Sequence, residues 1–169
     1  MNQILSKPAV RRSLILAVVT ALAVAATLVP VSARTREVKG EFRSSRVTPC
    51  SPTPICTEGR ATGDIEGRFT LTGTSLIPTA ETPSTGVIAY TAQVQIQTRE
   101  GSFTCTDTGV TKTTGEGAAS SICVLTGGTG IFQGATGYIQ FQSQLNARGN
   151  FVGTYQGRLS GLQGDPSES

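Results

Sequence analysis

Four charged side chains in the first half of the chain are of a type that could donate or accept a proton or steer charge in a substrate: Glu41, Asp64, Glu66 and Arg68. The chain contains no histidine, which removes the most frequent general base and metal ligand. Alternation with period two gives all four charged residues positions that face solvent. The sequence therefore assigns no catalytic residue.

Four cysteines are the other residues with chemistry of their own, and in an exported chain they suit two disulfides. They allow three pairings, of which we favour Cys50 with Cys56 and Cys105 with Cys123. The first pair closes a proline-rich segment, residues 48–56. The second lies nearly opposite across an expected hairpin that turns at residues 113–117. Metal binding is the rival reading, but the spacing is wrong and no histidine is available, and a redox-active pair is disfavoured because Cys-x-x-Cys does not occur. We therefore expect no metal and no cofactor.

A dense glycine cluster, residues 126–137, separates two strand-like runs. Gly128, Gly130 and Gly134 have some likeness to a phosphate-binding loop, which requires a helix to follow. Residues 138–145 instead alternate between apolar and polar, and no P-loop lysine is present. We interpret the cluster as a structural loop, anchored by apolar residues, whose shape depends on five glycines: Gly127, Gly128, Gly130, Gly134 and Gly137.

The elements that must position these residues are β-strands, because no segment shows a sustained helical period. We expect strands over residues 34–47, 61–77 (one long strand or a bent pair), 87–98, 103–112, 119–125, 138–145 and 150–160. Residues 78–86 read as a loop. This is an all-β pattern, and a meander of this kind is stable when it closes and leaves no edge, so we predict a closed antiparallel eight-stranded barrel. A membrane barrel would need aromatic girdles, whereas this chain has no tryptophan.

The amino terminus, residues 1–33, has the three parts of a secretion signal: a basic start, an uncharged apolar run over residues 13–29, and a small-residue cleavage site at residues 31–33. A retained membrane anchor is the alternative. We expect the signal to be removed and the protein to be periplasmic or secreted.

The remainder, residues 34–169, is expected to form one barrel domain with a flexible tail from about residue 162. The three basic residues of the leader account for the positive net charge, and 11 Lys and Arg then balance 11 Asp and Glu. Because no run of Lys or Arg occurs, we expect no nucleic-acid partner.

Residues 125–137, followed by an alternating strand and the segment Gly-Thr-Tyr-Gln-Gly-Arg-Leu at 153–159, resemble the C-terminal half of the allene oxide cyclase barrel-like proteins and, more distantly, dirigent proteins. The likeness covers residues 87–159 and is that of a bacterial-type secreted member. It implies a small barrel whose relatives include cofactor-free cyclases of unstable fatty-acid epoxides, and which commonly forms trimers. Only the glycines and Phe132 match, and their implied role is structural.

The first functional hypothesis is binding of a small apolar molecule inside the barrel. The expected lining residues are Phe42, Phe69, Tyr90, Ile96, Phe141 and Tyr155. A solid core filled by the same side chains is the alternative for each of them. The second hypothesis is a cofactor-free cyclase or isomerase, which requires an inward-facing polar group. The third is a structural or self-associating extracellular protein, such as a homo-trimer, that uses the uncharged ladders Gln93, Gln95, Gln97, Gln140, Gln142 and Gln144.

Overall fold

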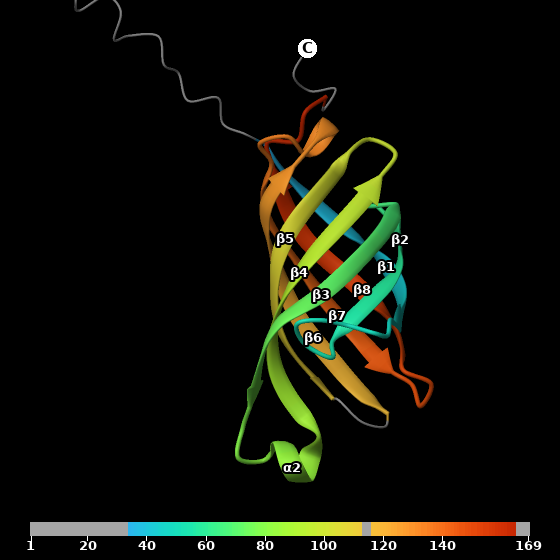
Figure 1. The fold of residues 1–169 in the computed structure, drawn as a ribbon. Coiled ribbons are helices and arrows are strands. Elements are labelled where there is room, and N and C mark those ends of the chain that lie inside the picture. The colour runs from blue at the N-terminus through green and yellow to red at the C-terminus, as the bar shows by residue number, and fades with distance from the viewer. Residues whose placement is uncertain (1–33, 113–115, 165–169) are drawn as a thin grey trace, which may run out of the picture. The chain divides into compact units, whose positions relative to one another are not determined.

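The computed structural model describes residues 34–112 and 116–164, which form a closed β-barrel (Figure 1). The expected leader, residues 1–33, lies outside the described residues. The strands are β1 (Thr35–Arg46), β2 (Cys56–Gly63), β3 (Gly67–Pro78), β4 (Val87–Thr98), β5 (Ser102–Lys112), β6 (Gly117–Gly128), β7 (Thr136–Leu145) and β8 (Asn150–Ser160). Each strand pairs antiparallel with the next, and β8 pairs back onto β1. The predicted closed eight-stranded antiparallel barrel is confirmed.

Side-chain alternation decides which face of each strand enters the core. In β4 the alternate residues from Ile88 to Ile96 are buried, whereas Gln93, Gln95 and Gln97 are exposed. Aromatic rings from β1, β3 and β7 meet inside, with the Phe42 ring centroid 6.0 Å from that of Phe69 and 5.4 Å from that of Phe141. The apolar face therefore points inward.

The segment expected as one long strand or a bent pair over residues 61–77 is a hairpin, since β2 ends at Gly63 and β3 begins at Gly67. Gly63 has a φ of 105°, which a side-chain-bearing residue rarely adopts, and this allows the chain to turn. Ile65 lies in the turn and is buried. Its backbone N–H donates to the Tyr155 hydroxyl at 2.7 Å, which ties the turn to β8.

The structure contains both expected disulfides. Cys50 is bonded to Cys56 across the proline-rich segment, with 5.7 Å between their Cα atoms. Cys105 on β5 is bonded to Cys123 on β6, with 5.5 Å between their Cα atoms. The second pair is diagonal rather than opposite, because the register of the β5–β6 hairpin sets Cys105 opposite Leu125 and Cys123 opposite Asp107. Two disulfides fit an oxidising, extracellular compartment.

The glycine cluster forms the end of β6, a 3-10 turn η1 (Gly130–Phe132) and the start of β7. Gly130 has a φ of 60° and Gly137 a φ of 135°, so both need the conformational freedom of glycine. Phe132 is buried, with its ring centroid 4.8 Å from that of Phe103. Beyond β8, the Gln163 N–H donates to the Ile131 carbonyl at 2.8 Å, so the described part of the expected tail contacts this loop.

The connection between β3 and β4, expected as a loop over residues 78–86, contains the short helix α2 (Thr82–Thr85). Among the described residues, no helix has the length and apolar character needed to cross a membrane.

Candidate functional site

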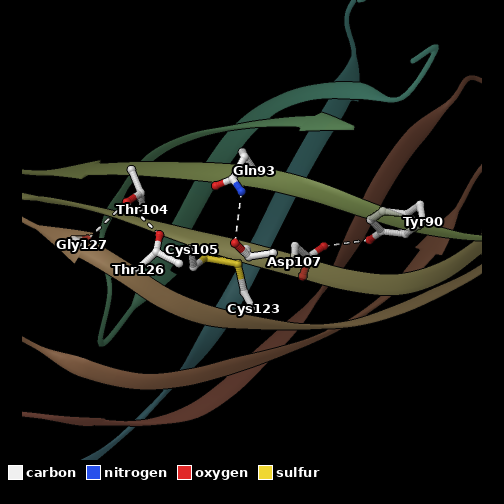
Figure 2. Close-up of a disulfide and its surroundings, with 9 residues drawn as sticks. Tyr90, Gln93, Thr104, Cys105, Asp107, Cys123, Thr126 and Gly127 are labelled. Atoms are coloured by element: carbon white, nitrogen blue, oxygen red, sulfur yellow. Dashed lines mark hydrogen bonds between the residues drawn. A yellow bond between two sulfur atoms is a disulfide. The ribbon is translucent and has the colours of Figure 1, made fainter. Parts of the chain in front are cut away.

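An aspartate lies inside the barrel on β5. Phe103, Cys105 and Asp107 occupy successive inward positions of this strand, and the Asp107 side chain is only 1% exposed. The Tyr90 hydroxyl, which projects inward from β4, donates to Asp107 Oδ2 at 2.9 Å (Figure 2). The Cys105–Cys123 disulfide lies beside the carboxyl, as the same view shows. The neighbouring strands thus hold a carboxyl and a phenol together in the core.

Burial sets the charge state of this pair. Burial raises the pKa of Asp107 from its ordinary 3.8 to about 6, against the opposing effect of the Ser121 and Tyr90 hydroxyls. Burial, followed by the nearby Asp107 charge, also raises the pKa of Tyr90, which remains a neutral donor. A carboxyl that titrates near pH 6 can hold, release or accept a proton under ordinary conditions.

One carboxylate oxygen has no partner. Asp107 Oδ1 is fully buried and makes no hydrogen bond with any residue that the structure describes. The Ser121 hydroxyl is near enough to lower the pKa of Asp107, but it does not donate a hydrogen bond to Oδ1. A buried acceptor of this kind is rare in folded proteins and can bind a hydrogen-bond donor.

Asp107 and Tyr90 line an internal cavity of about 70 Å3. Most of its wall is apolar, made by Phe42, Ile55, Phe69, Leu71, Val94, Phe141 and Phe151. The hydroxyl-bearing part of the wall is formed by Ser44, Thr57, Thr111, Ser121 and Ser143. One carboxyl and one phenol thus face a mainly aromatic and aliphatic space.

Four of the six expected lining residues, Phe42, Phe69, Tyr90 and Phe141, border this cavity. The other two, Ile96 and Tyr155, are buried elsewhere in the barrel. Ile96 belongs to the same buried core as Phe42 and Phe69 and lies two residues before the end of β4. The Tyr155 hydroxyl is occupied by the β2–β3 turn, lying 2.7 Å from the Ile65 nitrogen and 3.1 Å from the Thr62 oxygen.

The charged candidates from the first half of the chain are all exposed: Glu41, Asp64, Glu66 and Arg68. Asp64 accepts a hydrogen bond from the Lys39 N–H at 2.9 Å, and none of the four borders the cavity. Sequence reasoning missed Asp107. The alternation of β5 could have revealed it. Every second residue of this strand points inward, so Phe103 and Cys105 are followed by an inward Asp107. Across the described residues, no group of three or more potential metal ligands is assembled.

Comparisons with known proteins assign no function to this chain. No family model matches the chain, and no curated protein matches it. Among solved structures, the pterocarpan synthase dirigent protein PsPTS1 is similar at a TM-score of 0.33 and 15% identity, over 78% of this chain and 97% of that one. The pterocarpan synthase dirigent protein GePTS1 is similar at a TM-score of 0.32 and 16% identity, over 77% and 92%. The resemblance to allene oxide cyclases stays a prediction.

Proposed function

We propose that this protein is exported and binds a small, mainly apolar molecule that donates a hydrogen bond to Asp107. The observation that carries the proposal is the unpartnered Oδ1 of Asp107 on the wall of an apolar cavity. Leaving a buried acceptor unpaired costs about 1–3 kcal/mol, a cost that a bound hydroxyl or amine would remove. The apolar wall would supply the hydrophobic part of the affinity.

The size of the cavity limits the ligand. A volume of about 70 Å3 is far below the roughly 300–1,000 Å3 of sites for drug-sized molecules, so a ligand of only a few heavy atoms fits without movement. A larger ligand requires movement of lining residues, of which Ile55 belongs to the proline-rich segment. The Ile55 carbonyl accepts from the Gly73 N–H at 2.7 Å, and the Cys50–Cys56 disulfide restrains the same segment. Binding of larger molecules should therefore be slow.

Phenol and toluene form a matched probe pair, because they differ by a hydroxyl in place of a methyl group. We expect phenol to bind about five- to tenfold more tightly, as one net hydrogen bond contributes about 1 kcal/mol. Ligand-observed NMR and calorimetry measure the ratio. Asp107→Leu should abolish it, whereas Thr108→Leu, at an exposed position of the same strand, should preserve it. Failure of both probes to bind would contradict a cavity that opens to admit a benzene ring, and equal binding would exclude recognition by Asp107.

A cofactor-free isomerase or cyclase is the second candidate, since it requires an inward polar group and Asp107 is one. A carboxyl with a pKa of about 6 can protonate or deprotonate an apolar substrate bound against it. In this case Asp107→Asn should abolish turnover of a small epoxide while toluene still binds. Formation of the same product, with the same chirality, by the variant would exclude the role.

Self-association is the third candidate, favoured by the outer surface of β4 to β7. Apart from Lys112, the outward residues of these strands are uncharged, and five large apolar ones are 40–51% exposed: Val87, Val110, Ile122, Val124 and Tyr138. Val124 pairs directly with Tyr138 across β6 and β7. An oligomer such as a trimer should dissociate in sedimentation when Val124→Glu is introduced, but not with Thr154→Glu on β8. A monomeric native protein would contradict this candidate.

A further inference from the structure

Three arginines form one row across the outer face of β1, β2 and β3, which lie side by side in Figure 1. Arg43 is the cross-strand partner of Arg60, and Arg60 is the partner of Arg68. All three side chains are exposed. Because neighbouring strands lie about 4.8 Å apart, the row presents three positive charges at that repeat. No stretch of the sequence contains such a cluster, so the sheet register creates it.

Among the described residues, no acidic side chain forms an ion pair with this row. Arg43, Arg60 and Arg68 make no ion pair and no side-chain hydrogen bond with the residues that the structure describes, whereas Arg158 on β8 pairs with Glu37 at 3.0 Å. Like charges directly opposite each other destabilise a sheet. An arrangement that costs stability and leaves three guanidinium groups unpaired is suited to binding an external anion.

A second row of polar side chains runs parallel to the arginines. Ser45 pairs with Glu58, Glu58 with Thr70, and Thr70 with Gln95. The arginine row itself continues from Arg68 to Gln97 on β4. Both rows line one surface groove of about 800 Å3, together with Asn146 and Asn150 near the β7–β8 turn. The groove thus has one cationic side and one side of hydrogen-bonding groups.

We propose that this groove, hereafter the arginine groove, binds a short acidic oligosaccharide. Guanidinium groups pair with carboxylates or sulfates through two parallel hydrogen bonds, which suits anionic groups placed on successive sugars. The sugar hydroxyls would meet the second row, where Glu58 accepts hydrogen bonds and the amide of Gln95 both accepts and donates. This site lies on the outer face and does not depend on a ligand in the barrel cavity.

Glu58 favours a carbohydrate over a nucleic acid. Its carboxylate lies in the groove beside the arginines, where it would repel the continuous run of phosphates in a nucleic acid. The charge of the groove is three arginines against one glutamate. That is a small excess compared with the six to ten phosphate contacts, roughly, that give nucleic-acid binding its strength.

The test is calorimetric titration of the full chain with trigalacturonate. Separate titrations with neutral galactotriose and with a short single-stranded oligonucleotide serve as comparisons. We expect trigalacturonate to bind, the neutral trisaccharide to bind at least tenfold more weakly, and added salt to weaken the acidic ligand selectively. Arg60→Gln, at the centre of the row, should weaken trigalacturonate binding about tenfold or more, since a hydrogen bond to a charged group is lost. Arg60→Lys should recover part of the loss, because the charge remains while the fork geometry does not.

Arg158→Gln is the matched control, because it removes the same charge from an outward position beyond the arginine groove. It should leave trigalacturonate binding unchanged. The proposal would be overturned if the native protein did not bind millimolar trigalacturonate, if Arg60→Gln bound trigalacturonate as tightly as the native protein, or if the native protein had equal affinity for the neutral sugar. Tighter binding of the oligonucleotide would overturn it in favour of a nucleic-acid site.

Discussion

The stability of the barrel should fall as the pH rises through the titration of Asp107. The folded protein holds this proton with a pKa of about 6, whereas the carboxyl of the unfolded chain has the ordinary value of 3.8. Between these values the folded state binds more protons than the unfolded state, so the free energy of unfolding decreases with increasing pH. The stabilising effect is complete below about pH 4 and is lost above about pH 6.

The magnitude follows from the difference between the two pKa values. Each pKa unit corresponds to about 1.4 kcal/mol, so a rise of about two units corresponds to a loss of about 3 kcal/mol between acid and neutral pH. The full value applies because the side chain is only 1% exposed and is little screened by solvent. This is a substantial fraction of the 5–15 kcal/mol, roughly, that stabilises ordinary domains.

Comparison with Asp107→Asn isolates this effect, because the amide has the shape of the carboxyl and does not titrate. Urea unfolding of both proteins, with disulfides intact, should show their difference in unfolding free energy changing by about 3 kcal/mol from pH 4 to pH 7. Subtracting the two unfolding free energies cancels the contribution of the acidic groups that both proteins share. A difference that stays constant within about 1 kcal/mol would refute the buried, desolvated carboxyl on which the reasoning rests.

Three further predictions concern single contacts. Tyr90→Phe removes a donor that stabilises the carboxylate, so the pKa of Asp107 should rise further; an NMR titration that leaves the carboxyl midpoint unchanged would contradict this. Replacing both Cys105 and Cys123 by alanine should cost about 3 kcal/mol in denaturant unfolding, from loop closure over a sequence separation of 18, and no measurable loss would be inconsistent with the bond. Tyr155→Phe should cost about 1–3 kcal/mol by the same assay, because the β2–β3 turn loses a buried hydrogen bond, and a neutral result would remove that role.

The barrel could be predicted from the sequence because the alternation of β4, β7 and β8 gives each strand one apolar face, and the lack of tryptophan argued against placing that face toward a membrane. The hairpin at Gly63 to Gly67 was harder to read, since inward Ile65 continues the apparent period of β3 through a turn. The Cys50–Cys56 pairing could be predicted from the proline-rich segment and the Cys105–Cys123 pairing from the expected hairpin, although the register that sets Cys105 opposite Leu125 and makes the second pair diagonal leaves no clear mark in the sequence.

The candidate site could be predicted only in part. The predicted aromatic residues include three that line the apolar wall, Phe42, Phe69 and Phe141, and the inward position of Asp107 could have been counted from Phe103. Its hydrogen bond with Tyr90 depends on the stagger between β4 and β5, which places Tyr90 opposite Gly109 rather than Asp107. The arginine groove is another product of register, because its three residues come from different strands.

Closure of β1 against β8 places the two ends of the folded region next to each other. Thr35 pairs with Ser160, and their hydroxyl oxygens are 2.8 Å apart. A short linker across this junction, with a new start and end at α2, would yield a circular permutant that keeps every strand ladder while changing the order in which the ladders are synthesised. In such a chain β3 would come last and would close the barrel against β4. The order of synthesis and the closing seam can thus be varied while the cavity and the groove remain intact.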